Sequence, residues 1–289
     1  MMRIRYLIVS LVTTLVVGYM AWTNIFVLHD SKPYREREYS PEGDGSVHAY
    51  LINLDQSKDR LAEITPKLQN LGISYTRIPG VYGRGLSSEE KDQLVNRHRY
   101  LSLMHGNIGD GTVGCYLSHI KVWETFLESK SSYAIVFEDD ADFVPSDLKD
   151  VIDELIKCKD RWDVVTFDYL HYGHPMKILD LSQDANGSLV KFRTRVGNTG
   201  CYLINRKAAI SLLKKSLPIA MPVDHYFVRS WELGLKFTGV MPKVVHQRPS
   251  ASIRKQMDSR DTVSLRYKIS STIYQIFSQA ATCVYAYLW

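Results

Sequence analysis

The sequence predicts an α/β fold with a mainly parallel central sheet, together with an N-terminal transmembrane helix. Apolar runs of strand length at residues 47–54 and 73–78 flank a segment of helical character, and strand–helix–strand is how a parallel sheet begins. A third apolar run, 133–137, ends in a dense acidic cluster, at the strand end where open α/β sheets bind ligands. The transmembrane helix follows from residues 6–28, which contain no charge and have the length that crosses a bilayer.

The uncharged run from Tyr6 to Leu28 favours an uncleaved membrane anchor over a secretory signal peptide. Arg3 and Arg5 precede it, but the run is longer than a typical signal-peptide core and no small-x-small cleavage motif ends it. Residues 29–46 are polar and contain prolines and glycines, which is typical of a linker. We therefore expect an anchor at 1–28, a stem at 29–46 and the folded domain at 47–250.

The composition is that of an ordinary globular protein. The chain has 289 residues, of which 45% are hydrophobic and 23% charged, enough for one large or two small domains. A net charge of +5 permits contact with an anionic surface or substrate, and we find no basic and aromatic motif of an RNA-binding protein, so no nucleic acid partner is expected. The absence of a CxxC pair argues against a zinc cluster, whereas a disulfide between Cys115 and Cys201 stays open.

Beyond the first strand–helix–strand unit, periodicity and turn residues indicate further elements in order. The glycine-containing segment 109–114 is expected to break the chain before the next helix, where its backbone N–H groups could approach a phosphate. His119 on that helix is expected to be a structural histidine. The remaining expected elements are a charged helix at 87–104, helices at 115–127, 148–157 and 206–215, strands at 162–168, 200–204 and 236–240, and a loop-like insert at 170–188.

The acidic stretch that ends the 133–137 run predicts a metal site. Glu138, Asp139, Asp140 and Asp142 place four carboxylates within five positions, directly after a buried strand. Charges so close together repel one another and are costly to hold near an apolar core. Mg²⁺ or Mn²⁺ removes that cost, because both prefer carboxylate ligands. The alternative is an acidic turn in solvent that caps the following helix.

The C-terminal segment, 251–289, is expected to form a tail outside the domain. Basic residues precede an uncharged run from Ile269 to Trp289, in which apolar side chains recur at helical spacing. A basic run followed by such a helix fits a membrane interface. A terminal helix packed on the domain is the equal alternative.

Five separate stretches resemble glycosyltransferase family 25, a family that includes bacterial lipooligosaccharide galactosyltransferases and the transferase domains of collagen-modifying enzymes. The resemblance covers 47 to about 250 and implies a GT-A-like fold, a nucleotide-sugar donor and usually Mn²⁺. The sequence departs from the family pattern at Gly80-Val-Tyr-Gly83, where a small acidic turn ending in Asp-Gly is common. The five stretches are Tyr50–Asp55 with Asp59-Arg60, Gly114–His119, Phe137–Ala141, Cys201–Asn205 and Pro222–Asp224.

The resemblance and the chemistry of sugar transfer together assign roles to single residues. Asp140 is the first choice for metal contact, and Asp224, on a separate segment, is the candidate general base, with a helix N-cap as its alternative role. The other expected metal ligands are Asp142 and His246, and the expected donor-binding residues are Asn53, Asp55, Arg60, Glu138 and Asp139.

These assignments predict a hexosyltransferase that moves galactose or glucose from a nucleotide-sugar donor to a glycan or glycolipid acceptor, in lipopolysaccharide or other cell-surface glycan synthesis. A metal-dependent hydrolase of sugar or phosphate esters, or a catalytically silent membrane scaffold, are the alternatives. The expected location is a bacterial inner membrane with a cytoplasmic catalytic domain, and a type II Golgi protein is the alternative.

Overall fold

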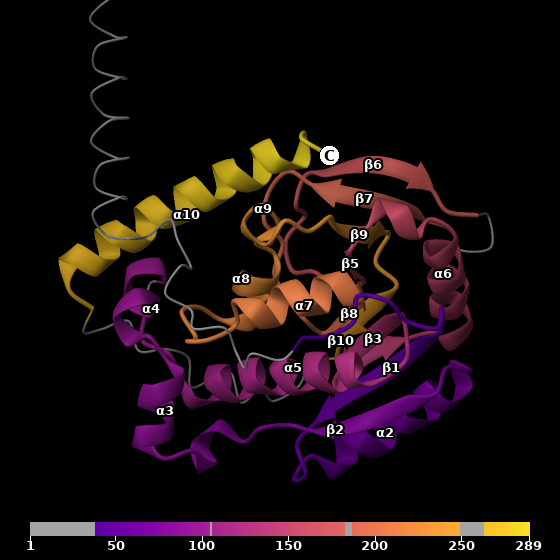
Figure 1. Ribbon diagram of the computed structural model, residues 1–289, viewed down its shortest axis with the longest axis horizontal. Helices are drawn as coiled ribbons and strands as arrows, with labels where there is room; N and C mark the ends of the chain where they lie inside the picture. Colours follow the sequence, from indigo (N-terminus) through magenta and orange to yellow (C-terminus); the bar gives the residue numbers. More distant parts are fainter. Residues whose placement is uncertain (1–37, 105, 183–186, 249–262) are drawn as a thin grey trace, which may run out of the picture.

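The computed structural model describes residues 38–104, 106–182, 187–248 and 263–289. Within this part of the chain, an eight-stranded sheet lies beside a two-stranded one (Figure 1). In spatial order the large sheet contains β2 (Tyr75–Pro79), β1 (Val47–Asn53), β3 (Tyr133–Glu138), β8 (Cys201–Asn205), β5 (Val164–Thr166), β9 (Phe237–Met241), β7 (Ser188–Phe192) and β6 (Pro175–Asp180). The small sheet pairs β10 (Val245–Gln247) with β4 (Ala141–Phe143).

Helices cover both faces of the large sheet. They are α2 (Lys58–Asn70), α3 (Ser88–Leu94), α4 (Arg97–Leu103), α5 (Asp110–Glu128), α6 (Pro145–Lys157), α7 (Arg206–Lys214), α8 (Val223–Phe227), α9 (Ser230–Leu233) and α10 (Leu265–Ala286), with 3-10 turns η1 (Gly83–Gly85) and η2 (Lys159–Arg161). The α/β class expected from the sequence is confirmed.

The sheet is mixed and not mainly parallel as expected, because β8 and β7 each run against both of their neighbours. β1 is parallel to β2 and β3, and β5 is parallel to β9, whereas β8 is antiparallel to β3 and β5. β8 begins where β3 ends, and the N–H of Glu138 donates to the backbone oxygen of Gly200. The residues just before β8 therefore lie beside the acidic turn that follows β3.

β3 is buried on both faces, which explains why its sequence is a continuous apolar run. Successive side chains of a strand point to opposite faces. Ala134 and Val136 enter the core that contains the apolar side of α5, while Ile135 and Phe137 enter a second core with α2 and α6. A strand that is covered by helices in this way carries any functional side chains at its ends.

Two expected elements differ in the structure because of contacts distant in sequence. The expected helix 87–104 is two helices, α3 and α4, because the backbone of Val95 forms a parallel bridge with Ile219 between them. The expected loop at 170–188 contains β6, which pairs with β7 at the edge of the sheet.

The glycine-containing segment at 109–114 lies mostly inside α5 instead of breaking the chain. Gly114 is helical, and a Cβ added there would lie 2.4 Å from the backbone oxygen of Val81. A Cβ on Gly83 would lie 1.9 Å from the backbone oxygen of Asp110. These glycines let η1 pack directly against the first turns of α5, so they serve close backbone contact.

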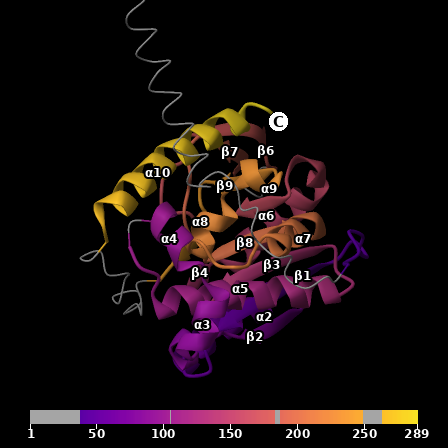
Figure 2. The same ribbon diagram turned by 60° about the vertical axis from the view of Figure 1, so that its left-hand side comes forward.

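α10 packs against the domain with its polar side inward. It contacts α4, α9 and β7, and Figure 2 shows it beside α4. Its buried residues are Ser270, Ser271, Tyr274, Ser278, Thr282 and Ala286, whereas Leu265, Ile269, Ile276 and Val284 are exposed. Of the two alternatives left open by the sequence, the structure shows the terminal helix packed on the domain, with its apolar face exposed.

The transmembrane prediction is not supported. Among the described residues, α10 included, no helix has both the length and the apolarity needed to cross a bilayer. The run from Tyr6 to Leu28, on which the prediction of an anchor was based, lies outside the described residues.

Candidate functional site

The acidic turn, residues 138–142, leaves the large sheet at the carboxyl end of β3. Glu138 is the last residue of that strand, and Asp142 lies in β4, which crosses to the small sheet. Phe137 and Phe143 stack with their ring centroids 5.0 Å apart, which closes the turn on its apolar side. The turn thus stands at the edge where the parallel strands β1 and β3 both end.

Asp139 is buried and joins the ends of β1 and β3. Its carboxylate accepts a hydrogen bond of 2.7 Å from Asn53 Nδ2 and pairs with Arg60 at 2.8 Å. Burial raises the pKa of Asp139, while Asn53 and Arg60 oppose the rise. Arg77 extends the cluster by donating to Asn53 Oδ1 at 2.9 Å and to Asp55 at 2.6 Å. The four donor-site residues expected from sequence on this side, Asn53, Asp55, Arg60 and Asp139, therefore form one network.

Glu138 faces a polar cluster of α5 and β8 that the sequence did not reveal. Its Oε1 accepts a 2.8 Å hydrogen bond from Thr199 Oγ1 and lies 3.4 Å from His119 Nε2. The other ring nitrogen of His119 lies 2.9 Å from the hydroxyl of Tyr202, which also accepts from Trp123 Nε1 at 3.0 Å. His119 was expected to be a structural histidine, and the structure places it against a predicted site residue.

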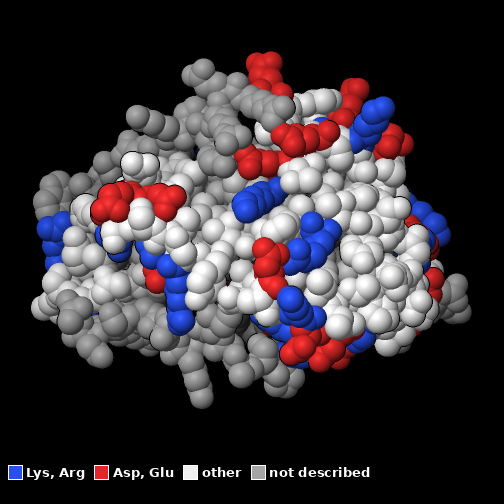
Figure 3. Space-filling model, turned by 90° about the horizontal axis from the view of Figure 1, so that it is seen from below, with Lys and Arg blue, Asp and Glu red and all other residues white. Residues whose placement is uncertain are grey.

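The three expected metal ligands lie along the small sheet. His246 stands directly opposite Asp142 in the antiparallel pair, so both side chains project from the same face. Asp140 accepts a 3.3 Å hydrogen bond from Gln247 Nε2, and Asp142 forms an ion pair with Lys67. Figure 3 shows acidic and basic groups interspersed on the side that α2 occupies, and α2 contributes both Arg60 and Lys67 to the turn.

Asp168 is a further buried carboxyl group at this edge. It follows β5, accepts a hydrogen bond from Asn198 Nδ2, and lies 3.6 Å from Lys243 Nζ. Asn198 has a φ of +96°, in the left-handed region, where a residue other than glycine is strained by about 1–3 kcal/mol. Such strain concentrates at functional sites. The signal in the sequence was a carboxylate at the end of the expected strand 162–168.

Asp224 lies near Gly197, at one end of the short segment 197–199 that lines this edge. It is in the first turn of α8, whose N-cap is Pro222, and its Oδ1 accepts from the N–H of His225 at 2.9 Å. A Cβ on Gly197 would lie 3.6 Å from Asp224 Oδ2. Gly197 and Thr199, which contacts Glu138, are two residues apart, which is at most roughly 7 Å. One short segment thus touches both Asp224 and Glu138.

Burial raises the pKa of Asp168, and the negative charge of Glu138 adds to the rise, while Lys243 and His246 oppose it. The charged carboxylate therefore lowers the free energy of unfolding at pH values above the raised pKa. This loss of stability disappears as the pH falls from the raised pKa to the ordinary one, because Asp168 then takes up a proton in the folded state. We expect Asp168→Asn to raise the urea midpoint of unfolding at pH 7 and to have little effect in acid. Asp150→Asn, at an exposed position of α6, is the control. A lower midpoint for Asp168→Asn at pH 7 would contradict the assignment of a desolvated charge.

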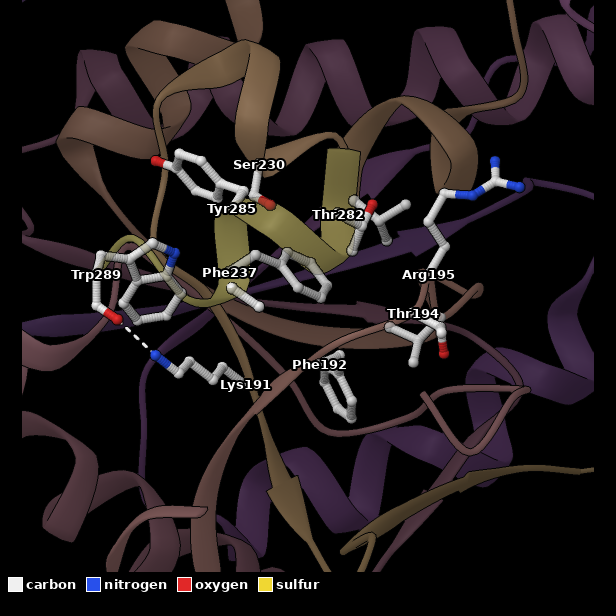
Figure 4. A pocket seen from close by; sticks show the side chains of 12 residues that line it. Lys191, Phe192, Thr194, Arg195, Ser230, Phe237, Thr282, Tyr285 and Trp289 are labelled. Atoms are coloured by element: carbon white, nitrogen blue, oxygen red, sulfur yellow. Dashed lines mark hydrogen bonds between the residues drawn. The ribbon is translucent and has the colours of Figure 1, made fainter. Parts of the chain in front are cut away.

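A small pocket beneath the end of α10 is separate from this edge. Figure 4 shows Lys191 donating from Nζ to the backbone oxygen of Trp289, with Phe192 and Phe237 nearby. Its volume is about 10 Å³, enough for about one water molecule. It is too small for a sugar nucleotide.

Comparisons with known proteins indicate one family. The sequence profile described as "Glycosyltransferase family 25 (LPS biosynthesis protein)" matches residues 46–227. A "Glycosyltransferase 25 family member" of Aedes aegypti is 28% identical over 191 residues, covering 63% of this chain and 30% of that protein. "Procollagen galactosyltransferase 1-A" of Xenopus laevis is 30% identical over 134 residues, with 44% and 22% covered. A "Probable inactive glycosyltransferase 25 family member 3" of Rattus norvegicus is 26% identical over 148 residues, with 47% and 24% covered.

The comparisons also correct the expected location. The chain matches 30% or less of the length of each of these three relatives, all of which are animal proteins. They give no support to the expected bacterial inner membrane, so that predicted location was wrong. Among the described residues no helix could cross a bilayer. The match between the family profile and 46–227, which includes the acidic turn, shows that this chain belongs to glycosyltransferase family 25.

Proposed function

We propose that this chain is a hexosyltransferase with a GT-A-like fold, which transfers galactose or glucose from a nucleotide-sugar donor to a hydroxyl group of a glycan or glycolipid acceptor. The observation that carries the proposal is the acidic turn at the carboxyl end of β3, at the edge where open α/β sheets bind ligands. Membership of the family supports transferase chemistry. The name of the Xenopus relative favours galactose.

The residues at the acidic turn have the donor chemistry that Mn²⁺ or Mg²⁺ requires, and the ligand atoms of Asp140, Asp142 and His246 would have to converge when the ion binds, because among the described residues they do not lie within 4.8 Å of one another. The donors of Asp140 and Asp142 are carboxylate oxygens, which both ions prefer. We propose that Asp140 holds the ion, with Asp142 and His246 completing the protein ligands after Lys67 releases Asp142. When bound, the ion would neutralise charge on the leaving diphosphate.

The other residues of the edge bind and orient the two substrates in this proposal. Asn53, Asp55, Arg60, Glu138 and Asp139 surround the donor from β1, α2 and β3. Asp224 accepts the proton of the acceptor hydroxyl as that oxygen attacks the sugar. Burial lowers the pKa of the neighbouring His225, with the charge of Asp224 opposing.

We expect Asp224→Asn to lower turnover by about 10²–10⁴-fold while the affinity for the nucleotide sugar stays nearly unchanged. The amide keeps the shape of the side chain and cannot accept the proton. Turnover and donor affinity would be measured separately, by initial rates and by calorimetry. Asp147→Asn, on the exposed start of α6, serves as the control. Loss of donor binding would instead make Asp224 a donor ligand, and a lower melting temperature with intact turnover would make it structural.

The proposed activity is tested by incubating the purified full chain with uridine diphosphate galactose or glucose and Mn²⁺, and measuring nucleoside diphosphate release and thermal stabilisation. Acceptors should include a lipopolysaccharide core oligosaccharide, suggested by the profile description, and a procollagen peptide, suggested by the Xenopus relative. Transfer that requires Mn²⁺ and disappears with EDTA is the expected result. No binding of any nucleotide sugar would overturn the proposal.

A catalytically silent protein is the second candidate, because one of the matched relatives is named as probably inactive. A silent protein of this fold would show no turnover with any donor and acceptor pair, even where a nucleotide sugar binds. A metal-dependent hydrolase would release product from sugar or phosphate esters without binding a nucleotide sugar. The same panel of donors therefore separates the three functions.

A further inference from the structure

Cys115, His119 and Glu138 converge beside the acidic turn. Cys115 and His119 lie four residues apart on α5, one helical turn, so they share a face. Glu138 reaches them from the end of β3, and one potential ligand atom of each residue lies within 4.8 Å of the other two. Among the residues that the structure describes, no other group of three His, Cys, Asp or Glu side chains comes this close.

The three donors differ in kind from those of the acidic turn. A thiolate, an imidazole and a carboxylate are the ligands of Zn²⁺, and the thiolate is the donor that Mg²⁺ and Mn²⁺ do not prefer. No disulfide joins Cys115 to Cys201. Cys115 and Glu138 are partly exposed and His119 is buried, so the group can be reached from the surface.

The surroundings of His119 fix its ring in the orientation that a metal needs. The Tyr202 hydroxyl lies 2.9 Å from Nδ1, and Trp123 Nε1 holds that hydroxyl from the other side at 3.0 Å. Nε2 then faces Glu138 Oε1 at 3.4 Å. A hydrogen-bond partner on the second ring nitrogen is the usual support of a metal-ligating histidine.

We propose that Cys115, His119 and Glu138 form a Zn²⁺ site, with water as the fourth ligand. Bond lengths of about 2.0–2.3 Å in a tetrahedral site bring ligand atoms to about 3.5 Å from one another. His119 Nε2 and Glu138 Oε1 already have this spacing, so the adjustment is mainly an approach of Cys115 by roughly 1 Å at most. The Cys115 thiol gives its proton to solvent, and the neutral His119 ring carries its proton on Nδ1, next to Tyr202. The ligands come from a helix and a strand, so a search of the sequence for a CxxC motif does not detect them.

The Zn²⁺ site would regulate the transferase, a consequence that rests on the proposed function. Glu138 is two residues from Asp140, the proposed ligand of the catalytic ion. Zn²⁺ that draws Glu138 towards α5 removes a carboxylate from the donor site. Zn²⁺ should therefore inhibit transfer in the presence of saturating Mn²⁺, and Cys115→Ser should reduce that inhibition.

Co²⁺ is the probe that tests the site without any reference to activity, because a cobalt–thiolate bond gives a charge-transfer band in the near ultraviolet and tetrahedral Co²⁺ absorbs strongly in the visible. The full chain would be titrated with Co²⁺, followed by Zn²⁺. We expect both bands in the unaltered chain, their loss as Zn²⁺ displaces Co²⁺, and no charge-transfer band in Cys115→Ser. Cys158→Ser removes another half-exposed thiol and should keep both bands.

Tyr202→Phe keeps all three ligands and removes the support of His119, so it should weaken Zn²⁺ binding by about 10–100-fold in competition with a chromophoric chelator. Absence of the charge-transfer band in the unaltered chain would overturn the proposal, and so would its persistence in Cys115→Ser. If the chain binds Co²⁺ in this way but transfers no sugar, the Zn²⁺ site stands and the proposed function fails.

Discussion

Replacing Asp140 with asparagine is expected to lower the rate of sugar transfer by about 10²-fold or more and to weaken metal-dependent binding of the nucleotide sugar. The substitution keeps the size of the side chain and its contact with Gln247, but removes the charge that would hold the ion. Initial rates and calorimetric titration of the donor, each with and without Mn²⁺, measure the two effects. The melting temperature should change little, because Asp140 is only partly buried.

The control for this substitution is Asp150→Asn, which changes an exposed carboxylate of α6 by the same chemistry. It should leave the rate and the donor affinity intact. Full activity of Asp140→Asn would remove Asp140 from the metal site. In that case Asp142, which leaves its ion pair with Lys67 in the proposed site, becomes the next carboxylate to test.

Replacing Arg206 with methionine is expected to destabilise the fold by about 3–5 kcal/mol. Arg206 is 4% exposed, and its guanidinium donates to backbone oxygens around the end of α5 and to that of Ser40. The acceptors are the backbone oxygens of Ser40, Phe126, Leu127, Ser129 and Ser131, at distances of 2.8 to 3.4 Å. Each buried carbonyl left without a donor costs about 1–3 kcal/mol, although solvent can reach some of them once the side chain is shortened.

Urea denaturation of Arg206→Met would measure this effect, with Lys214→Met as the control. Lys214 lies at the exposed C-terminal turn of the same helix, α7, so its loss should cost less than about 1 kcal/mol. Arg206→Lys should recover only part of the stability, because a single ammonium group cannot reach all the oxygens that surround the planar guanidinium group. Equal midpoints for the two methionine variants would show that the carbonyls find other partners.

The sequence predicted those parts of the site that depend on neighbouring residues. The run from Tyr133 to Glu138 and the carboxylates after it follow one another in the chain, so local pattern is sufficient to place them at a strand end. The contact of Thr199 with Glu138 spans 61 residues, and that of Asn198 with Asp168 spans 30. Both depend on β8 entering the sheet against its neighbours, which no local pattern encodes.

Contacts distant in sequence also decide which face of α10 is buried. Periodicity identifies which side chains share a face but not which face meets the domain. Here the domain presents backbone oxygens, those of Ser102 and Leu103, and these require donors. Ser270 Oγ and Gln275 Nε2 supply them, each at 2.9 Å.

This inward polar face has a consequence for the specificity of packing. Apolar contacts are non-directional, so a helix held by leucine and isoleucine could turn about its axis at modest cost. Hydrogen bonds have strict angles, and a half turn of α10 would bury Ile269 and Ile276 while leaving the oxygens of Ser102 and Leu103 without donors. The contact between α10 and these backbone oxygens therefore fixes one rotation of the helix about its axis. Its hydroxyl and amide groups define the orientation of the helix more than they stabilise its packing.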